Sequence, residues 1–245
     1  MTRVERIVSL VPSVTELLLA LGVGDRIVAT TTFCPAVDGA ALVRGTKNPQ
    51  VDAIVALAPD LVFANVEENR ERDVEQLRAA GLNVHVSFPR TVAQAAQMVR
   101  EVGALVGAEQ AAAAIADEID AERARLHERA SPDPVTVFCA VWCDPWMAVG
   151  DDTYAADLLA TAGLMVVPPG LKRYPRVTLD QVRALSPRLV LLPSEPYAFT
   201  DADVDVFDGW AARVMLVDGQ LLTWHGARTA EALRNFSAYA LAETR

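Results

Sequence analysis

Few side chains in this sequence have the types and spacing that catalysis or metal binding requires. Cys139 and Cys143 are separated by three residues and have no histidine nearby in the sequence. We interpret them as buried thiols and expect no metal site. Asp201–Asp205 (DADVD) imitates the start of a calcium loop, but glycine is missing at its sixth position and Ala212 stands at the twelfth, where a glutamate is needed. That segment is therefore expected to be a solvated acidic turn.

The motifs of the common enzyme classes are also missing. The sequence has no G-x-G-x-x-G, P-loop, H-E-x-x-H or G-x-S-x-G, and no nucleophile and base at a spacing typical of catalysis. His85 and His127 are expected to be structural. We therefore predict no catalytic residues and no intrinsic cofactor.

The first segment predicts a place where a ligand can meet free backbone N–H groups. Residues 6–11 (RIVSLV) are typical of a buried strand, and Ser13 followed by Glu16 has the spacing of a capping box that begins a helix. A strand over 26–31 completes a βαβ unit. The helix start then lies at the carboxyl end of the first strand, where a polar or anionic group can bind. A capped helix without a ligand explains this feature equally well.

Two stretches of the chain resemble each other and predict two lobes of related plan. Residues 57–64 (LAPDLVFA) align with residues 185–192 (LSPRLVLL), and each stretch follows a short helical segment. In both, a proline ends the helix and a buried strand begins, and Glu67 aligns with Glu195 just beyond the strands. A helix–proline–strand junction is common, so coincidence is the alternative.

Between these stretches, residues 108–130 contain no Gly or Pro and favour one long helix. We predict an α/β fold with an N-terminal lobe over 1–107, a linking helix over 108–130 and a C-terminal lobe over 131–245. An ordinary surface helix within one domain is the alternative. Further helices are predicted over 71–80, 91–106, 154–162 and 228–241, and further strands over 83–87, 135–141 and 213–217.

The composition of the chain limits the kinds of partner that it can bind. The net charge of −10 and the pI near 4.8 argue against nucleic acid or an anionic membrane. Three cysteines in 245 residues imply no disulfide framework. No run reaches the roughly 18 apolar residues that span a bilayer. The first residues do not form a signal peptide, so a cytoplasmic location follows if Met1 is the native start.

Three segments carry a specific resemblance to a known family. Residues 6–28 (RIVSLVPSVTELLLALGVGDRIV), 48–69 (NPQVDAIVALAPDLVFANVEEN) and 222–228 (LTWHGAR) resemble cobalamin-binding proteins. These belong to the helical-backbone class (class III) of substrate-binding proteins, which includes receptors for cobalamin, haem and ferric siderophores that deliver to ABC importers. The resemblance implies two Rossmann-like lobes joined by a single long helix, with cobalamin in the cleft between them. It also implies an extracytoplasmic location and a monomer.

The motifs of that class imply which residues contact the ligand. A corrinoid is a wide, largely apolar disc with amide arms, so flat aromatic walls and a few hydrogen-bonding groups suit it. Trp142 and Trp146 have the alternative role of covering the core. The implied ligand-binding residues are Pro12, Ser13, Phe33 in the Phe33-Cys34-Pro35 turn, Asn65, Trp142, Trp146, Met147, Tyr174, Trp224 and Arg228.

The same resemblance implies one carboxylate on each lobe that docks on an ABC permease. The matching residues are Glu71 and Asp180, and capping of a helix start is the alternative role for both. Haem or a ferric siderophore is the alternative ligand. In that case the basic residues Lys172, Arg173, Arg176 and Arg228 would matter more. A cytosolic corrinoid-handling protein or enzyme on the same fold is the third possibility.

Overall fold

The computed structural model describes residues 3–243, which form two compact α/β units. Unit 1 comprises the residues up to Pro89, together with Ala95–Asp117 and His225–Ala227. Unit 2 comprises Arg90–Gln94, Glu118–Trp224 and the residues from Arg228 onward. The predicted fold class, two α/β lobes, is confirmed. The predicted lobe limits, at 107/108 and 130/131, stay a prediction.

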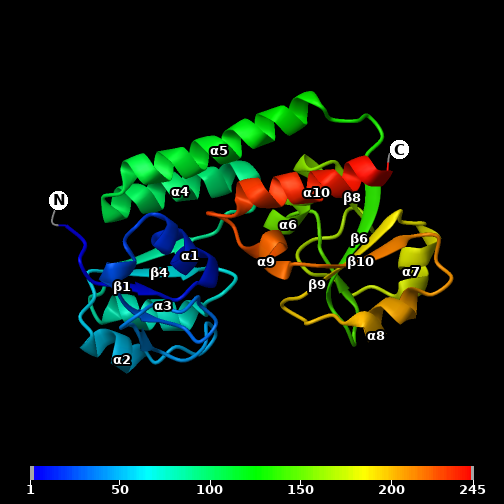
Figure 1. Ribbon diagram of the computed structural model, residues 1–245. Helices are drawn as coiled ribbons and strands as arrows, with labels where there is room; N and C mark the ends of the chain where they lie inside the picture. Colours follow the sequence, from blue (N-terminus) through cyan, green and yellow to red (C-terminus); the bar gives the residue numbers. More distant parts are fainter. Residues whose placement is uncertain (1–2, 244–245) are drawn as a thin grey trace. The chain divides into compact units, whose positions relative to one another are not determined.

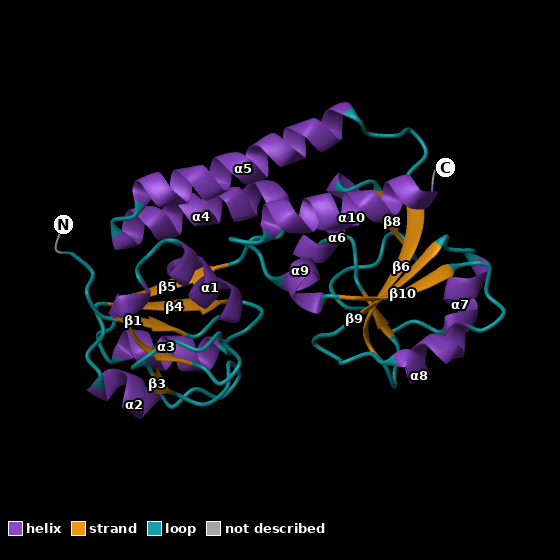
Figure 2. Cartoon of the chain, in the orientation of Figure 1, coloured by secondary structure: helices purple, strands orange, loops and turns teal. Residues whose placement is uncertain are grey.

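Unit 1 is built on a five-stranded parallel sheet in the order β3-β2-β1-β4-β5. Figure 2 shows α1 on one face of this sheet and α2 and α3 on the other. The elements are β1 (Ile7–Ser9), α1 (Pro12–Ala20), the 3₁₀ helix η1 (Gly24–Arg26), β2 (Ile27–Thr30), β3 (Ala41–Leu42), α2 (Val51–Ala56), β4 (Leu61–Asn65), α3 (Glu71–Ala79) and β5 (Val84–Ser87).

The sheet of unit 1 is buried on both faces, which explains its almost continuous apolar strands. Every residue of β1 and β4 is buried. Val8 and Val62 of the sheet belong to one core cluster with Ile54 of α2 and Leu77 of α3. Every strand pair is parallel, so the carboxyl ends of all five strands lie at one edge of the sheet, where ligands bind in open α/β folds.

Two long helices follow β5, namely α4 (Val92–Val106) and α5 (Glu109–Glu128). Helix α5 matches the long helix predicted from the lack of Gly and Pro, with ends two residues or fewer from the predicted ones. The division between the units falls inside this helix, after Asp117. None of the helices within residues 3–243 is both long and apolar enough to cross a membrane.

Unit 2 is built on the sheet β10-β9-β6-β7, with β8 also paired to β6. All pairs are parallel except β6 with β7. Its core cluster includes Phe138, Val182, Val190 and Phe207. The elements are β6 (Val135–Trp142), β7 (Met147–Ala148), α6 (Tyr154–Thr161), β8 (Leu164–Val166), α7 (Leu179–Ala184), β9 (Leu189–Pro193), α8 (Asp201–Val204), the 3₁₀ helix η2 (Asp205–Phe207), β10 (Arg213–Val217), α9 (Gly219–Thr223) and α10 (Thr229–Glu243). Figure 1 follows the chain through both units.

The two similar sequence stretches have the same local structure. The residue before each proline has a left-handed backbone, with φ of 45° at Ala58 and 46° at Ser186. The residue after each proline donates its backbone N–H to a carbonyl near the start of a neighbouring strand. Asp60 donates to Arg6 O, just before β1 (2.9 Å), and Arg188 donates to Thr136 O, in β6 (3.0 Å). The strands β4 and β9 then begin one residue later. The repeat is therefore structural and not a coincidence of composition.

One local prediction is wrong. Helix α1 begins at Pro12 with Val11 as its N-cap, and no side chain caps it. Proline fits the first helical position because its φ is fixed and that position needs no N–H donor, so Ser13 lies inside the first turn instead of capping the helix. The segment Asp201–Asp205, expected to be a solvated acidic turn, begins with the single helical turn α8, which has no buried residue.

Candidate functional site

Unit 1 exposes large apolar side chains at the carboxyl edge of its sheet. Phe33 follows β2 and is 66% exposed, while Leu42 ends β3 and is 63% exposed. Val66 follows β4 and is 53% exposed, and Phe88, just after β5, is also exposed. Outside this edge, Leu19 and Leu105 are the other exposed large apolar side chains among the described residues of unit 1. We name Phe33, Leu42, Val66 and Phe88 the unit 1 edge patch.

Phe33 has a defined support despite its exposure. A Cβ atom on Gly45 would lie 3.0 Å from Cε2 of the Phe33 ring, so the ring packs closely over this glycine. The neighbouring Cys34 thiol lies 3.2 Å from the Thr31 hydroxyl. The predicted turn therefore holds one aromatic face toward solvent. Leu42, Val66 and Phe88 were not predicted, because single apolar residues at strand ends carry no pattern in the sequence.

Asn65, a predicted ligand residue, is the centre of a buried hydrogen-bond network and is only 2% exposed. Its Nδ2 donates to Ser87 Oγ (3.3 Å) and lies 3.4 Å from His225 Nε2. Its Oδ1 accepts the Glu67 N–H (2.7 Å), and its own N–H donates to Asn69 Oδ1 (2.9 Å). These bonds occupy the amide, so Asn65 shapes the loop after β4 from beneath.

The network continues to neighbouring loops through Asn69. Its Nδ2 donates to Leu10 O (3.3 Å) and to Thr46 O (2.9 Å). The loops after β1, β3 and β4 are therefore tied together under the unit 1 edge patch. Buried polar groups of this kind are costly to leave unpaired, so these hydrogen bonds stabilise the loops at this edge.

Pro12 and Ser13 lie at the start of α1, beside this edge, and both are buried. Thr15 stabilises the turn that leads into the helix, because its hydroxyl lies within hydrogen-bond distance of Ser9 Oγ (2.8 Å) and of Val11 O (3.0 Å). The two predicted residues therefore lie close to the carboxyl edge of the unit 1 sheet, although the Ser13 hydroxyl does not form a cap.

His225 belongs to unit 1 and is buried next to Asn65. Burial disfavours the charged imidazolium and lowers the pKa of His225 to about 4. The ring is therefore neutral at physiological pH. The sequence singles out this residue only through its neighbours in the TWHGAR segment.

In unit 2 the predicted tryptophans have different surroundings. Trp142 ends β6, is 42% exposed and meets Tyr197 edge to face with ring centroids 5.5 Å apart. Trp146 is instead partly buried in the core cluster, where its ring stacks on Phe199 at 5.7 Å and meets Phe207 at 5.4 Å. The core-covering alternative therefore describes Trp146, while Trp142 presents an open ring at a strand end.

Met147 and Tyr174 belong to one folded-back segment. Residue Met147 forms a bridge with Arg176, and the Ala148 N–H donates to Pro175 O (3.0 Å). The Arg173 guanidinium lies 5.6 Å from the centre of the Tyr174 ring. The pairing of residues 147–148 with residues 175–176 places Tyr174 near β7. The ligand-binding role of Tyr174 and Met147 stays a prediction.

Trp224 and Arg228 form a second aromatic surface in unit 2. The Arg228 guanidinium lies 5.2 Å from the centre of the indole ring, and the same guanidinium is 3.9 Å from Asp218. The indole Nε1 donates to Glu195 Oε1 at 2.7 Å. Glu195 was not among the predicted ligand residues. Its alignment with Glu67, just beyond a strand end, was the one signal for it in the sequence.

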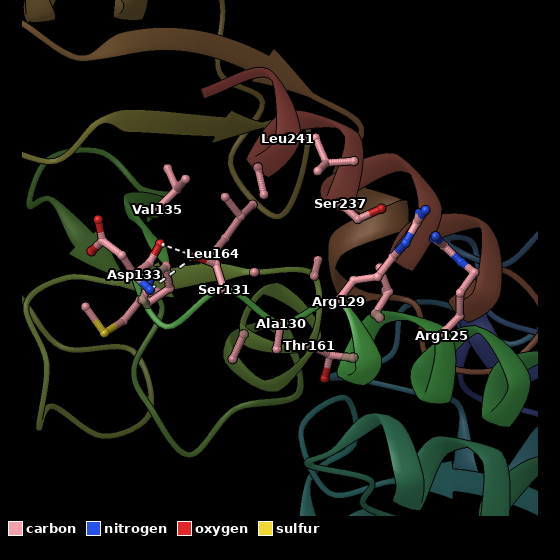
Figure 3. A pocket seen from close by; sticks show the side chains of 17 residues that line it. Arg125, Arg129, Ala130, Ser131, Asp133, Val135, Thr161, Leu164, Ser237 and Leu241 are labelled. Atoms are coloured by element: carbon pink, nitrogen blue, oxygen red, sulfur yellow. Dashed lines mark hydrogen bonds between the residues drawn. The ribbon is translucent and has the colours of Figure 1, made fainter. Parts of the chain in front are cut away.

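One cavity of unit 2 lies away from these aromatic residues. Its volume is about 400 Å³, and it opens between the ends of α5 and α10, beside the first residues of β6 and β8 (Figure 3). Arg125 and Arg129 stand at one side, while Val135 and Leu164 form part of an apolar wall. This is the amino end of the sheet, and none of the predicted ligand residues lines the cavity.

The two predicted docking carboxylates are exposed and uninvolved in capping. Arg70 is the N-cap of α3, which leaves Glu71 at its first position. Thr178 and Gln181 form the capping box of α7, so Asp180 does not cap it. Within residues 3–243 the structure gives neither carboxylate a hydrogen bond or an ion pair. It also shows no cluster of three or more metal-ligating side chains in that range.

Comparison with known proteins defines the class. Residues 7–208 match the periplasmic binding protein family, and the chain belongs to that family. A vitamin B12-binding protein of Photorhabdus laumondii is 27% identical over 192 residues, which are 76% of this chain and 70% of that protein. An uncharacterized ABC transporter substrate-binding lipoprotein of Bacillus subtilis is 26% identical over 250 residues, which are 95% of this chain and 79% of that protein.

Solved structures agree on the fold. The periplasmic vitamin B12-binding protein of Vibrio cholerae has a TM-score of 0.85 at 20% identity and covers 99% of this chain and 98% of its own. A periplasmic heme-binding protein of Roseiflexus, in apo form, also has a TM-score of 0.85, at 22% identity, covering 99% and 100%. The chain is therefore a member of the periplasmic binding protein family, a class of binding proteins and not of enzymes.

Proposed function

We propose that this chain binds a corrinoid, cobalamin first, and delivers it to an ABC importer. The observation that carries the proposal is the apolar and aromatic surface at strand carboxyl ends in each unit: Phe33, Leu42, Val66 and Phe88 in unit 1, and Trp142 in unit 2. Exposed apolar side chains gathered at a ligand-binding edge mark a binding surface. Each surface offers apolar area that a corrinoid could cover.

The chemistry of these surfaces suits a corrinoid. Flat rings at Phe33, Trp142 and Trp224 provide area for a broad apolar disc, and such contacts add about 0.5–1.5 kcal/mol each beyond area burial. Amide arms need both donors and acceptors. In unit 2, Tyr174 carries a phenol group, and the Glu195 carboxylate and Arg228 guanidinium stand at the edge and face of Trp224.

The sequence relatives support the choice of ligand and the delivery step. A relative named for vitamin B12 binding aligns over most of this chain, and another is named as an ABC transporter substrate-binding lipoprotein. We infer that a permease recognises Glu71 and Asp180, since both carboxylates are exposed and bound to nothing in the described chain. The protein would act as a monomer outside the cytoplasm, where its relatives work.

Haem or a ferric siderophore is the second candidate ligand. Two stacked arginines in unit 2, Arg173 on Tyr174 and Arg228 on Trp224, favour this candidate because such ligands are often anionic. The affinities for the two candidate ligands should respond differently when a positively charged side chain is removed. Arg228→Ala should weaken binding of an anionic chelate more than binding of neutral cyanocobalamin.

The proposal is tested by equilibrium dialysis of wild type and of Trp224→Ala, Tyr174→Ala and Arg228→Ala with cyanocobalamin, haemin and a ferric siderophore. Each aromatic variant should weaken cobalamin binding roughly tenfold, since about 1.4 kcal/mol corresponds to a factor of ten. Tyr239→Ala and Trp210→Phe are matched controls in unit 2, because these aromatic rings pack on Phe236 and Phe207, away from the strand ends. Unchanged affinity of both aromatic variants for every ligand would show that the site is misplaced.

A further inference from the structure

One carboxylate oxygen fixes the edge of Trp224. Glu195 Oε1 accepts the indole Nε1–H at 2.7 Å and the Thr223 hydroxyl at 3.0 Å. Thr223 is itself held, because the same hydroxyl lies 2.9 Å from Gly219 O. A short bond from an indole N–H to a charged acceptor is directional and stronger than a neutral one. It therefore restricts rotation of the indole and sets which way its faces point.

The position of Glu195 is set by close backbone packing. A Cβ atom on Gly219 would lie 2.6 Å from the Glu195 backbone N and 2.8 Å from its O, distances that no side chain can occupy. Glycine at position 219 thus allows the start of α9 to approach the segment after β9. The Gly219 N–H also donates to Ser194 Oγ at 3.0 Å. Close packing against the start of α9 therefore fixes the backbone of Glu195 and the position from which its carboxylate extends.

Charges of both signs surround this indole, and negative charge is in excess. Arg228 lies over the ring face, at 5.2 Å from its centre, and is also 3.9 Å from an Asp218 oxygen. Glu195 stands at the ring edge. Two carboxylates therefore accompany one guanidinium. Within the part of the chain that the structure describes, Oε2 of Glu195 makes no hydrogen bond, which leaves an acceptor for a ligand.

We propose that Glu195 is a positioning and specificity-determining residue of the ligand site. Its hydrogen bond fixes the orientation of the Trp224 ring. Its negative charge disfavours ligands that carry carboxylates or catecholates, and its second oxygen can accept hydrogen bonds from the N–H groups of neutral amide arms. This inference rests on the proposed function, because it assumes that Trp224 contacts the ligand. Specificity of this kind comes from repulsion of the wrong ligand as much as from attraction of the right one.

Two variants separate the two roles of Glu195. Glu195→Gln keeps an oxygen that can accept the indole N–H but removes the charge, and Glu195→Ala removes both. Glu128→Gln, an exposed carboxylate at the end of α5, controls for the change in net charge. Positioning is read without ligand from the ¹H–¹⁵N resonance of the Trp224 indole, assigned by its loss in Trp224→Phe. Specificity is read from dialysis with cyanocobalamin and with haemin.

The indole resonance should shift strongly in Glu195→Ala and much less in Glu195→Gln. Glu195→Ala should bind cyanocobalamin about tenfold more weakly, whereas Glu195→Gln should stay within about threefold of wild type and bind haemin about tenfold more tightly. An unshifted indole resonance in Glu195→Ala would overturn the positioning role. Equal effects of Glu195→Gln on both ligands would overturn the specificity role. If wild type binds neither ligand, the proposed function fails and the specificity role with it, while the indole resonance still decides the positioning role.

Discussion

Phe33→Ala should weaken cobalamin binding and leave the fold intact. A phenylalanine side chain buries ~150–200 Å² when fully enclosed. Because Phe33 is 66% exposed in the free protein, roughly 100–130 Å² remains for a ligand to cover. At ~25 cal/mol per Å² this amounts to about 3 kcal/mol for complete coverage. A ligand that covers about half of the ring would therefore gain ~1.5 kcal/mol, and the variant should bind roughly tenfold more weakly.

Equilibrium dialysis with cyanocobalamin, read by absorbance, measures this loss directly. Leu105→Ala provides the matched control, because Leu105 is an exposed apolar residue of the same unit that lies on α4, away from the edge patch. Both variants should unfold in urea within about 0.5 kcal/mol of wild type, as expected for exposed positions. Binding by Phe33→Ala within twofold of wild type would refute the conclusion that the unit 1 edge patch contacts the ligand.

Three further predictions concern the docking carboxylates, the buried His225 and the hydrogen-bond network of Asn65. Reversing charge at Glu71 and Asp180 together should abolish import in cells and leave dialysis affinity unchanged; normal import would refute their docking role. Because the pKa of buried His225 is lowered to about 4, the unfolded state takes up its proton first as pH falls below ~6.5, so urea stability should drop from there toward pH 4. His225→Gln should flatten that drop, and an identical slope would contradict the assignment. Asn65→Leu should cost about 2–3 kcal/mol in urea unfolding, since it strands buried partners at Ser87 and Glu67, and a change below ~0.5 kcal/mol would contradict the network.

Much of the fold was predictable because proline and glycine mark where its elements begin and end. Pro59 and Pro187 precede the buried strands β4 and β9, and the absence of both residue types over 108–130 indicates α5. The short strands β3 and β8 were missed, because two or three residues cannot show periodicity. Ser13 was misassigned as a cap because Pro12 and Ser13 both favour a helix start, and the proline decided it.

The site was less predictable, because side-chain surroundings depend on residues distant in the sequence. Trp142 and Trp146 look equivalent in the sequence, yet Phe199 and Phe207 bury Trp146 in the core and leave Trp142 open. The network around Asn65 depends on a contact with a residue 160 positions away. Glu195 gains its role only through α9, which brings Trp224 to it.

We propose that this member of the periplasmic binding protein family binds a corrinoid. Mixing the purified protein with cyanocobalamin, haemin or a ferric siderophore, desalting, and recording the absorbance spectrum shows which ligand it retains. Cyanocobalamin should elute with the protein at close to one molecule per chain, and Phe33→Ala should retain less. Protein that emerges without cobalamin while retaining haemin or the siderophore would contradict the proposal.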